Sequence, residues 1–165
     1  MGVEIRYTYI TDLPTLRKWV TETAVQRWLP IEGDIEREGF LQSWMGFSRY
    51  SASLTATCEG KPCGMGTLYL LPYQKVAHRA LFQLVVDPGH VRQGIGTTLL
   101  RNLKHLARNY FHLEWMQIDL ISGNPAQYLL EKQGFRLFTR QEGYFKDGYG
   151  LHARLSYEAH LNGGL

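Results

Sequence analysis

The chain has 165 residues, of which 44% are hydrophobic and 20% are charged, a composition typical of a single globular domain over residues 1–165. Its formal net charge of +3 is too small for the dense basic face of a nucleic-acid-binding protein, and no apolar run approaches the ~20 residues that cross a bilayer. Because the N-terminus lacks the apolar core of a signal peptide, we expect a cytoplasmic protein with no nucleic-acid and no membrane partner.

The first half of the chain predicts two helices between strands. Asp12 and Pro14 are typical of a helix start, and an apolar face continues from there. The predicted elements are an edge strand at 3–9, a helix from 12 to 24, a loop at 27–33, a helix from 34 to about 47, and strands at about 51–58 and 63–71.

Two cysteines, Cys58 and Cys63, flank the turn between the last two of these strands. A metal pair would need further ligands nearby, and the neighbouring sequence offers none. A disulfide across the hairpin is the alternative, but without an export signal we expect two reduced strand residues and no bound metal.

The stretch from Leu81 to Leu100 is the most informative part of the sequence. An apolar strand over 81–86 is stopped by Asp87, Pro88 and Gly89. A basic, glycine-bearing turn follows, and apolar residues then recur at the spacing of one helix face up to Tyr110. Backbone N–H groups at a helix start are unpaired and carry positive potential, so this pattern predicts a phosphate site.

The C-terminal third predicts a strand, a short helix and a closing hairpin. Asn124 before Pro125 is typical of a helix start, and Gly134 of a helix end. The predicted elements are a strand at 115–121, a helix ending at 133–135, strands at about 135–145 and 149–159, and a turn at 146–148. The order β-α-α-β-β-β-α-β-α-β-β predicts an α/β (α+β) fold with helices on both faces of a mixed sheet.

Two motifs resemble those of the GCN5-related N-acetyltransferase (GNAT) family. Its coenzyme A signature reads here from Val91 to Gly96, with valine where the family usually has glutamine or arginine. A second landmark runs from Asn124 to Phe135, with the asparagine one residue closer than usual and Leu130 where a tyrosine often stands. The resemblance covers nearly the whole chain and implies a mostly antiparallel sheet of about seven strands with splayed central strands.

The resemblance also implies which residues bind acetyl-CoA as a cosubstrate. The backbone of the 81–86 strand would pair with the pantetheine arm, and an N–H near Val86 would polarise the thioester carbonyl. The turn would hold the pyrophosphate, and Asn124 would reach the pantetheine arm. The implied cofactor-binding residues are Leu84, Val85, Val86, Val91, Arg92, Gln93, Gly94, Ile95, Gly96, Thr97, Asn124 and Tyr128.

Catalytic side chains are harder to place, because Leu81 and Leu130 stand where the family often keeps its base and its acid. His78, Asp119 and Tyr144 are the candidates for these roles, and deprotonation through water is the alternative. Trp28 and Glu32 are the candidates for binding the acceptor substrate.

The implied activity is transfer of an acetyl group to the primary amine of a small molecule or amino acid, by direct attack on the thioester. Two alternatives stay open: acetylation of a peptide or protein N-terminus, and an acyl-CoA-binding sensor without turnover. The protein is expected to act as a monomer or a homodimer.

Overall fold

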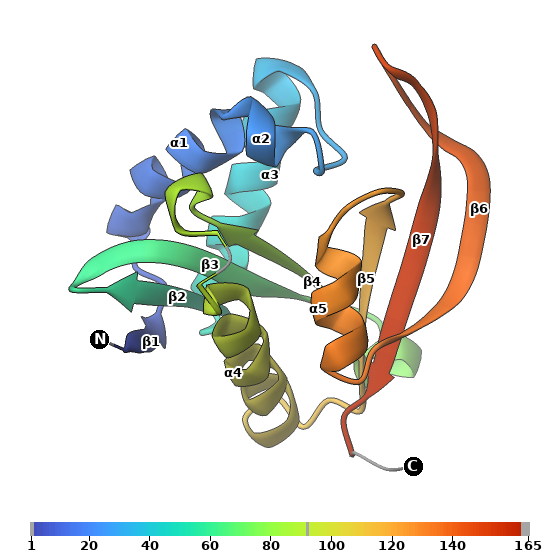
Figure 1. The fold of residues 1–165 in the computed structure, drawn as a ribbon. Helices are drawn as coiled ribbons and strands as arrows, with labels where there is room; N and C mark the ends of the chain where they lie inside the picture. The colour runs from blue at the N-terminus through green and yellow to red at the C-terminus, as the bar shows by residue number, and fades with distance from the viewer. Residues whose placement is uncertain (1, 92, 163–165) are drawn as a thin grey trace.

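A seven-stranded sheet with the order β1-β2-β3-β4-β5-β7-β6 runs through the computed structural model, which describes residues 2–91 and 93–162 (Figure 1). Only β4 and β5 pair in parallel, and the other neighbours are antiparallel, which confirms the mixed, mostly antiparallel sheet. The strands are β1 (Val3–Tyr7), β2 (Ser53–Cys58), β3 (Lys61–Leu70), β4 (Arg79–Val86), β5 (Trp115–Ile121), β6 (Arg136–Asp147) and β7 (Gly150–His160).

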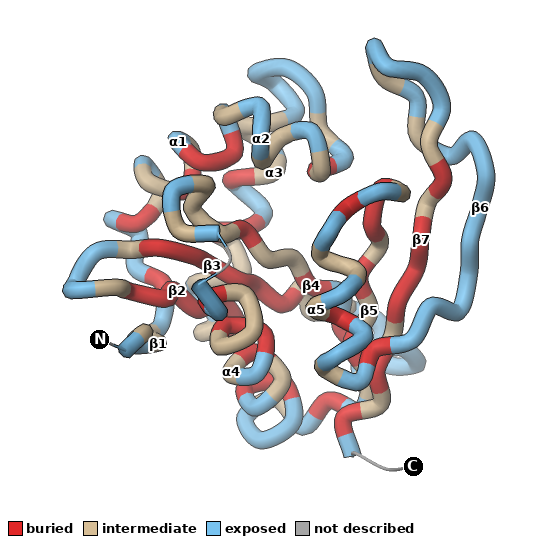
Figure 2. The backbone as a smooth tube through the Cα atoms, viewed as in Figure 1, coloured by how far each residue is buried: buried red, intermediate tan, exposed pale blue. Residues whose placement is uncertain are grey.

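Helices cover both faces of this sheet, as the sequence predicts. The helices are α1 (Leu13–Thr21), α2 (Thr23–Gln26), α3 (Gly33–Ser48), α4 (Ile95–Asn109) and α5 (Ala126–Lys132). One core joins α1 and α3 to the sheet through Met65 and Val85, and a larger core packs α4 and α5 against the other face. Buried positions therefore run along β2, β3 and β4, whereas β6 is exposed over most of its length (Figure 2).

Several element boundaries differ from the sequence-based prediction. β1 ends at Tyr7 because a 3-10 turn occupies Ile10–Asp12. The first helix ends at Thr21, and the extended backbone of Glu22 separates it from α2. β4 begins at Arg79, two residues early, and the closing turn is formed by residues 148–149 instead of 146–148.

The parallel pairing of β4 with β5 is short. It covers only Arg79–Leu81 opposite Trp115–Gln117, although β4 continues to Val86 and β5 to Ile121. The two strands then diverge, which is the splay that the family resemblance implies. Both strands keep their antiparallel neighbours over this region, so the gap lies between two well-supported half-sheets.

Cys58 and Cys63 are free thiols whose Sγ atoms lie 2.6 Å apart across the β2–β3 hairpin. Burial, together with the Cys58 thiol, raises the pKa of Cys63 to about 12. Within the described residues, no three His, Cys, Asp or Glu side chains are grouped as a metal site would require. None of the described helices combines the length and the apolar character that a bilayer span needs.

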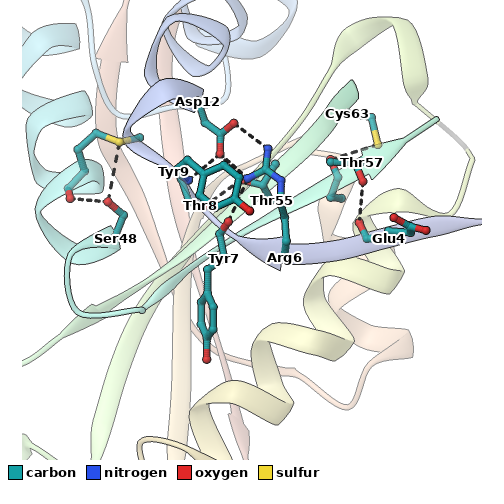
Figure 3. Close-up of polar contacts among 12 residues, drawn as sticks. Glu4, Arg6, Tyr7, Thr8, Tyr9, Asp12, Ser48, Thr55, Thr57 and Cys63 are labelled. Carbon is teal, nitrogen blue, oxygen red and sulfur yellow. Dashed lines mark hydrogen bonds and ion pairs between the residues drawn. The ribbon is translucent and has the colours of Figure 1, made fainter. Parts of the chain in front are cut away.

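A buried ion pair fixes the start of α1 against the sheet (Figure 3). The Asp12 side chain is buried and accepts hydrogen bonds from the Arg6 guanidinium at 2.8 and 2.9 Å. It also accepts from the Tyr9 N–H at 2.8 Å and from the Thr55 hydroxyl at 3.1 Å. Burial alone would raise the pKa of Asp12, but these hydrogen bonds outweigh burial and hold the pKa below its ordinary value.

Asp12→Asn should therefore destabilise the fold by about 1–3 kcal/mol, because the asparagine amide turns a donor toward the donors of Arg6. The folded pKa of Asp12 is depressed, so its contribution is complete above the ordinary carboxyl pKa of 3.8 and is lost as the pH falls through the folded pKa. Urea denaturation at a series of pH values should show the two proteins converging in acid.

The matched control is Asp34→Asn, which removes the exposed ion pair of Asp34 with Arg37 at the start of α3. Exposed pairs contribute little, so this change should stay within ~0.5 kcal/mol of wild type. Equal losses from the two substitutions would contradict a special role for Asp12.

Candidate functional site

An apolar cavity of about 410 Å³ opens where β4 and β5 separate. Four consecutive β4 residues form one wall, and β5, α5, α2 and the loop after α2 form the others. The lining residues are Ala24, Val25, Trp28, Leu29, Gln83, Leu84, Val85, Val86, Pro88, Val91, Gly96, Ile118, Leu120, Asn124, Pro125, Ala126, Leu129 and Leu130.

The backbone of β4 presents hydrogen-bonding groups to this cavity. The Asp87 N–H donates to the Cys63 carbonyl on β3 at 2.9 Å. In an antiparallel pair, the backbone N–H and C=O groups of alternate residues point to the same neighbouring strand. The backbone groups of Val85 and Gln83 therefore point to β3, and those of Leu84 and Val86 point to the gap. An extended ligand lying in the gap can therefore pair with β4 as a strand would.

The turn after β4 leads into the N-terminus of α4. Asp87 shapes the turn by accepting the Gly89 N–H at 3.1 Å, and Gly94 takes a φ of +78°, a left-handed conformation that glycine adopts without strain. The first intrahelical bond runs from the Thr98 N–H to the Gly94 carbonyl, so the N–H groups of Ile95, Gly96 and Thr97 precede it.

These N–H groups and the dipole of the 15-residue helix α4 can bind an anion at the mouth of the apolar cavity. Gly96 lines that cavity, and its missing side chain matters because a Cβ there would lie 3.1 Å from Leu129. Val91 also lines the cavity, Gln93 and Gly94 are exposed in the turn, and Arg92 lies outside the described residues.

A second, more polar cavity of about 560 Å³ lies between the α2–α3 loop and the β6–β7 hairpin. The tip of this hairpin lies on the same side of the molecule as the loop (Figure 1). Leu29 lines both cavities, so they meet there. The other lining residues are Thr23, Gln26, Arg27, Pro30, Ile31, Glu32, Glu36, Ile121, Phe145, Lys146, Asp147, Gly148 and Tyr149.

The second cavity is lined by charged side chains of both signs: the carboxylates Glu32, Glu36 and Asp147 and the cations Arg27 and Lys146. Asp147 lies 2.9 Å from His152 Nε2 and accepts the Tyr149 N–H at 2.8 Å. These hydrogen bonds hold the pKa of Asp147 below its ordinary value, so it is ionised at neutral pH. Glu36 accepts the Glu32 N–H at 2.8 Å, which places two further carboxylates on the opposite wall.

Of the three residues that the sequence suggested for catalysis, none lines either cavity among the described residues. His78 precedes β4 at its paired end, and its carbonyl accepts the Glu114 N–H, so it lies at the opposite end of the strand from the splay. Asp119 accepts the Ser156 hydroxyl at 2.7 Å, and Arg154 stacks on the exposed Tyr144 ring at 4.2 Å.

Before α5, Asn124 lines the apolar cavity, and its Oδ1 accepts the Ala126 N–H at 2.9 Å in the turn that leads into the helix. Leu130 lines the same cavity, whereas the Tyr128 side chain is 63% exposed and points elsewhere. Trp28, expected to bind the acceptor, lines the apolar cavity, and Glu32 lines the polar one.

Sequence reasoning missed several residues that line the cavities. Gln83 is the one polar residue in the strand 81–86, and that interruption could have marked it. Leu29 and Ile121 carry no sequence signal, because only the fold brings their elements together. The sequence predicts only a turn at Asp147, and the cavity that its carboxylate borders depends on the hairpin register.

The arrangement suits a long ligand with a phosphate end and an extended arm, whose far end meets a polar cavity lined by charged side chains. Residues 13–135 match the model of the acetyltransferase (GNAT) family. No curated protein sequence matches the chain.

Solved structures of acetyltransferases share the fold. The yncA protein from Salmonella typhimurium, solved with its cofactor acetyl-CoA, is 17% identical with a TM-score of 0.83, covering 98% of this chain and 95% of that one. A ribosomal-protein-alanine N-acetyltransferase from Brucella melitensis is 24% identical with a TM-score of 0.81, covering 95% of this chain and 99% of the other.

Proposed function

This chain belongs to the acetyltransferase (GNAT) family, and from that premise we propose that it transfers the acetyl group of acetyl-CoA to the primary amine of a small molecule or an amino acid. The observation that carries the proposal is the open edge of β4, which leads from the N-terminus of α4 to the junction with the polar cavity at Leu29. The similar Salmonella typhimurium structure with acetyl-CoA supports the choice of donor.

In this proposal the pyrophosphate meets the N–H groups around Gly94 and Gly96, and the pantetheine arm runs back along β4. Val86 is nearer to the phosphate turn than Leu84 is, so the pantetheine amide would meet Val86 first. The thioester at the far end would then reach the Leu84 N–H, one hydrogen-bonding position deeper than the sequence suggested.

The chemistry needs a polarised carbonyl and an uncharged amine. The Leu84 N–H would donate to the thioester oxygen and stabilise the negative charge that develops as the amine nitrogen attacks the carbonyl carbon. The C–S bond then breaks, the amide is released, and the coenzyme A thiolate takes a proton from water. The amine's proton also leaves to water, because the described lining at the junction is the apolar Leu29.

The acceptor would enter through the polar cavity. The carboxylates of Glu32, Glu36 and Asp147 would attract its ammonium form before deprotonation. A peptide N-terminus is the second candidate, because this cavity is larger than the cofactor cavity and is bordered by an exposed hairpin. The similarity to a ribosomal-protein-alanine N-acetyltransferase supports keeping it.

Release of free thiol from acetyl-CoA, measured over a panel of amines, amino acids and short peptides, tests the function. We expect thiol release that depends on the amine and yields an equal amount of N-acetyl product. Release with peptides alone would favour the second candidate. Tight acetyl-CoA binding with no release across the panel would instead indicate a sensor.

Turnover should rise with pH along the ionisation of the acceptor amine, because deprotonation in water precedes attack. Two acceptors of different pKa should therefore give two different midpoints in the pH profile of kcat/KM. Placed proton-transfer groups contribute about 10²–10⁴ in rate, so His78→Ala, Asp119→Asn, Tyr128→Phe and Tyr144→Phe should each cost less than about a hundredfold. A midpoint shared by all acceptors, with one of these variants inactive but folded, would show that a side chain is the base.

Gly96→Val should weaken acetyl-CoA binding at least tenfold, about 1.4 kcal/mol, because the new side chain presses on Leu129 at the mouth of the cavity. Calorimetry on the folded variant measures this change. Gly39→Val is the control, since Gly39 is also helical and a Cβ there meets no described atom within 4 Å. Unchanged affinity in Gly96→Val would remove the α4 N-terminus from the site.

A further inference from the structure

The cofactor cavity contains two carboxamide side chains, Gln83 and Asn124, in a lining made otherwise of apolar residues and glycines. Both carboxamide oxygens accept a backbone N–H: Asn124 from Ala126 at 2.9 Å, and Gln83 from Leu84 at 3.1 Å. The two bonds differ in what they support. The Asn124 bond forms the turn that leads into α5, whereas the Gln83 bond belongs to no helix or sheet ladder.

The Leu84 N–H, which donates to the Gln83 carboxamide, faces the gap between β4 and β5. Gln83 itself pairs with Thr67 on β3, and its neighbour Leu84 directs its N–H to the opposite side. Beyond Leu81 the parallel ladder has ended, so β5 supplies no carbonyl at this position. A side chain of β4 therefore provides the acceptor that a neighbouring strand would normally provide.

We propose that Gln83 is a positioning residue that occupies the Leu84 N–H while the site is empty and yields it to the thioester carbonyl of acetyl-CoA. The inference rests on the proposed function, in which Leu84 polarises the thioester. A carboxamide oxygen and a thioester oxygen are both carbonyl acceptors, so the N–H is satisfied in each state and the exchange breaks no secondary structure.

Two consequences follow for the reaction. Acetyl-CoA must displace an existing hydrogen bond, so its affinity is lower than the contacts of an open N–H would give. The Gln83 side chain lies on the same sheet face as Val85, which packs with α1 and α3. Its carboxamide is released on that face only when the thioester has arrived, so in this proposal cofactor binding changes one wall of the cofactor cavity.

The test compares acetyl-CoA with S-ethyl-coenzyme A, a thioether of the same size in which a methylene replaces the carbonyl. Gln83→Met keeps the length of the side chain and removes the acceptor. By calorimetry, acetyl-CoA should bind this variant about two- to tenfold more tightly than it binds wild type, the range of one net hydrogen bond. The thioether, which does not compete for the Leu84 N–H, should bind both proteins equally.

Two further variants separate this role from general packing. Gln117→Met is the matched control on β5, where Gln117 donates to Asp119 at 3.3 Å and lies outside the cofactor cavity; it should leave the ratio of the two affinities unchanged. Gln83→Glu supplies a charged, stronger acceptor, so acetyl-CoA should lose affinity relative to the thioether.

Amide NMR of the wild-type protein gives a signal that would not change if Gln83 had only a packing role. The side-chain NH₂ resonances of Gln83 should shift with acetyl-CoA and stay in place with the thioether, while the Leu84 amide remains protected from exchange in both complexes. This measurement and Gln83→Glu keep the proposal testable if Gln83→Met does not fold.

An unchanged or lowered ratio of acetyl-CoA to thioether affinity in Gln83→Met would overturn the inference. The proposed function would stand in that case, because wild-type thiol release is measured separately. A wild-type protein that binds neither ligand would overturn both.

Discussion

The parallel pairing of β4 and β5 ends after three residues, and the rest of the molecule's organisation depends on that early end. A strand edge inside a domain leaves N–H groups without a partner, and each such group costs about 1–3 kcal/mol when buried. Total stabilities of domains are about 5–15 kcal/mol, so an open edge is a substantial cost. The Gln83 carboxamide removes part of it at Leu84, and a bound extended arm would remove more.

The two cores keep the gap open by holding β4 from both sides. Val85 is 2% exposed and packs with α1 and α3, whereas Phe82 is 2% exposed and packs with α4 and α5. β5 is held independently by the full-length ladder to β7. Closing the gap would mean moving one half-sheet against its helices, which close packing resists. The buried pair of Arg6 and Asp12 contributes to the same rigidity by tying β1 and the start of α1 to β2.

The sequence predicted the fold and the strand–turn–helix arrangement at residues 81–100 well, because both depend on local patterns. Residues 81–100 have the periodicity of a strand and a helix with glycine between them, and the structure places β4, Gly94 and α4 there. The acceptor side could not be predicted in the same way. Leu29 and Phe145 meet in one cavity only because the β6–β7 hairpin reaches back to the α2–α3 loop, a contact between segments more than 100 residues apart. Nor could the sequence show that His78, Asp119 and Tyr144 lie outside the described lining of both cavities, because that depends on which way each strand faces in the fold.

Two positions at which the family often has a charged or hydroxyl side chain carry leucine in this protein. The groups that assist the proposed reaction must therefore lie elsewhere. Leu81 and Leu130 offer no proton transfer, and Leu130 lines the cofactor cavity directly. An apolar wall strengthens the remaining electrostatic contacts, because a hydrogen bond to a developing oxyanion is stronger in a medium of low dielectric constant than in water. In the proposed reaction the backbone N–H of Leu84 would be the main polarising group, and the charged side chains of the second cavity would influence which amines reach it. Selectivity in this protein would accordingly reside in the β6–β7 hairpin and the α2–α3 loop, while reactivity resides in the main chain of β4.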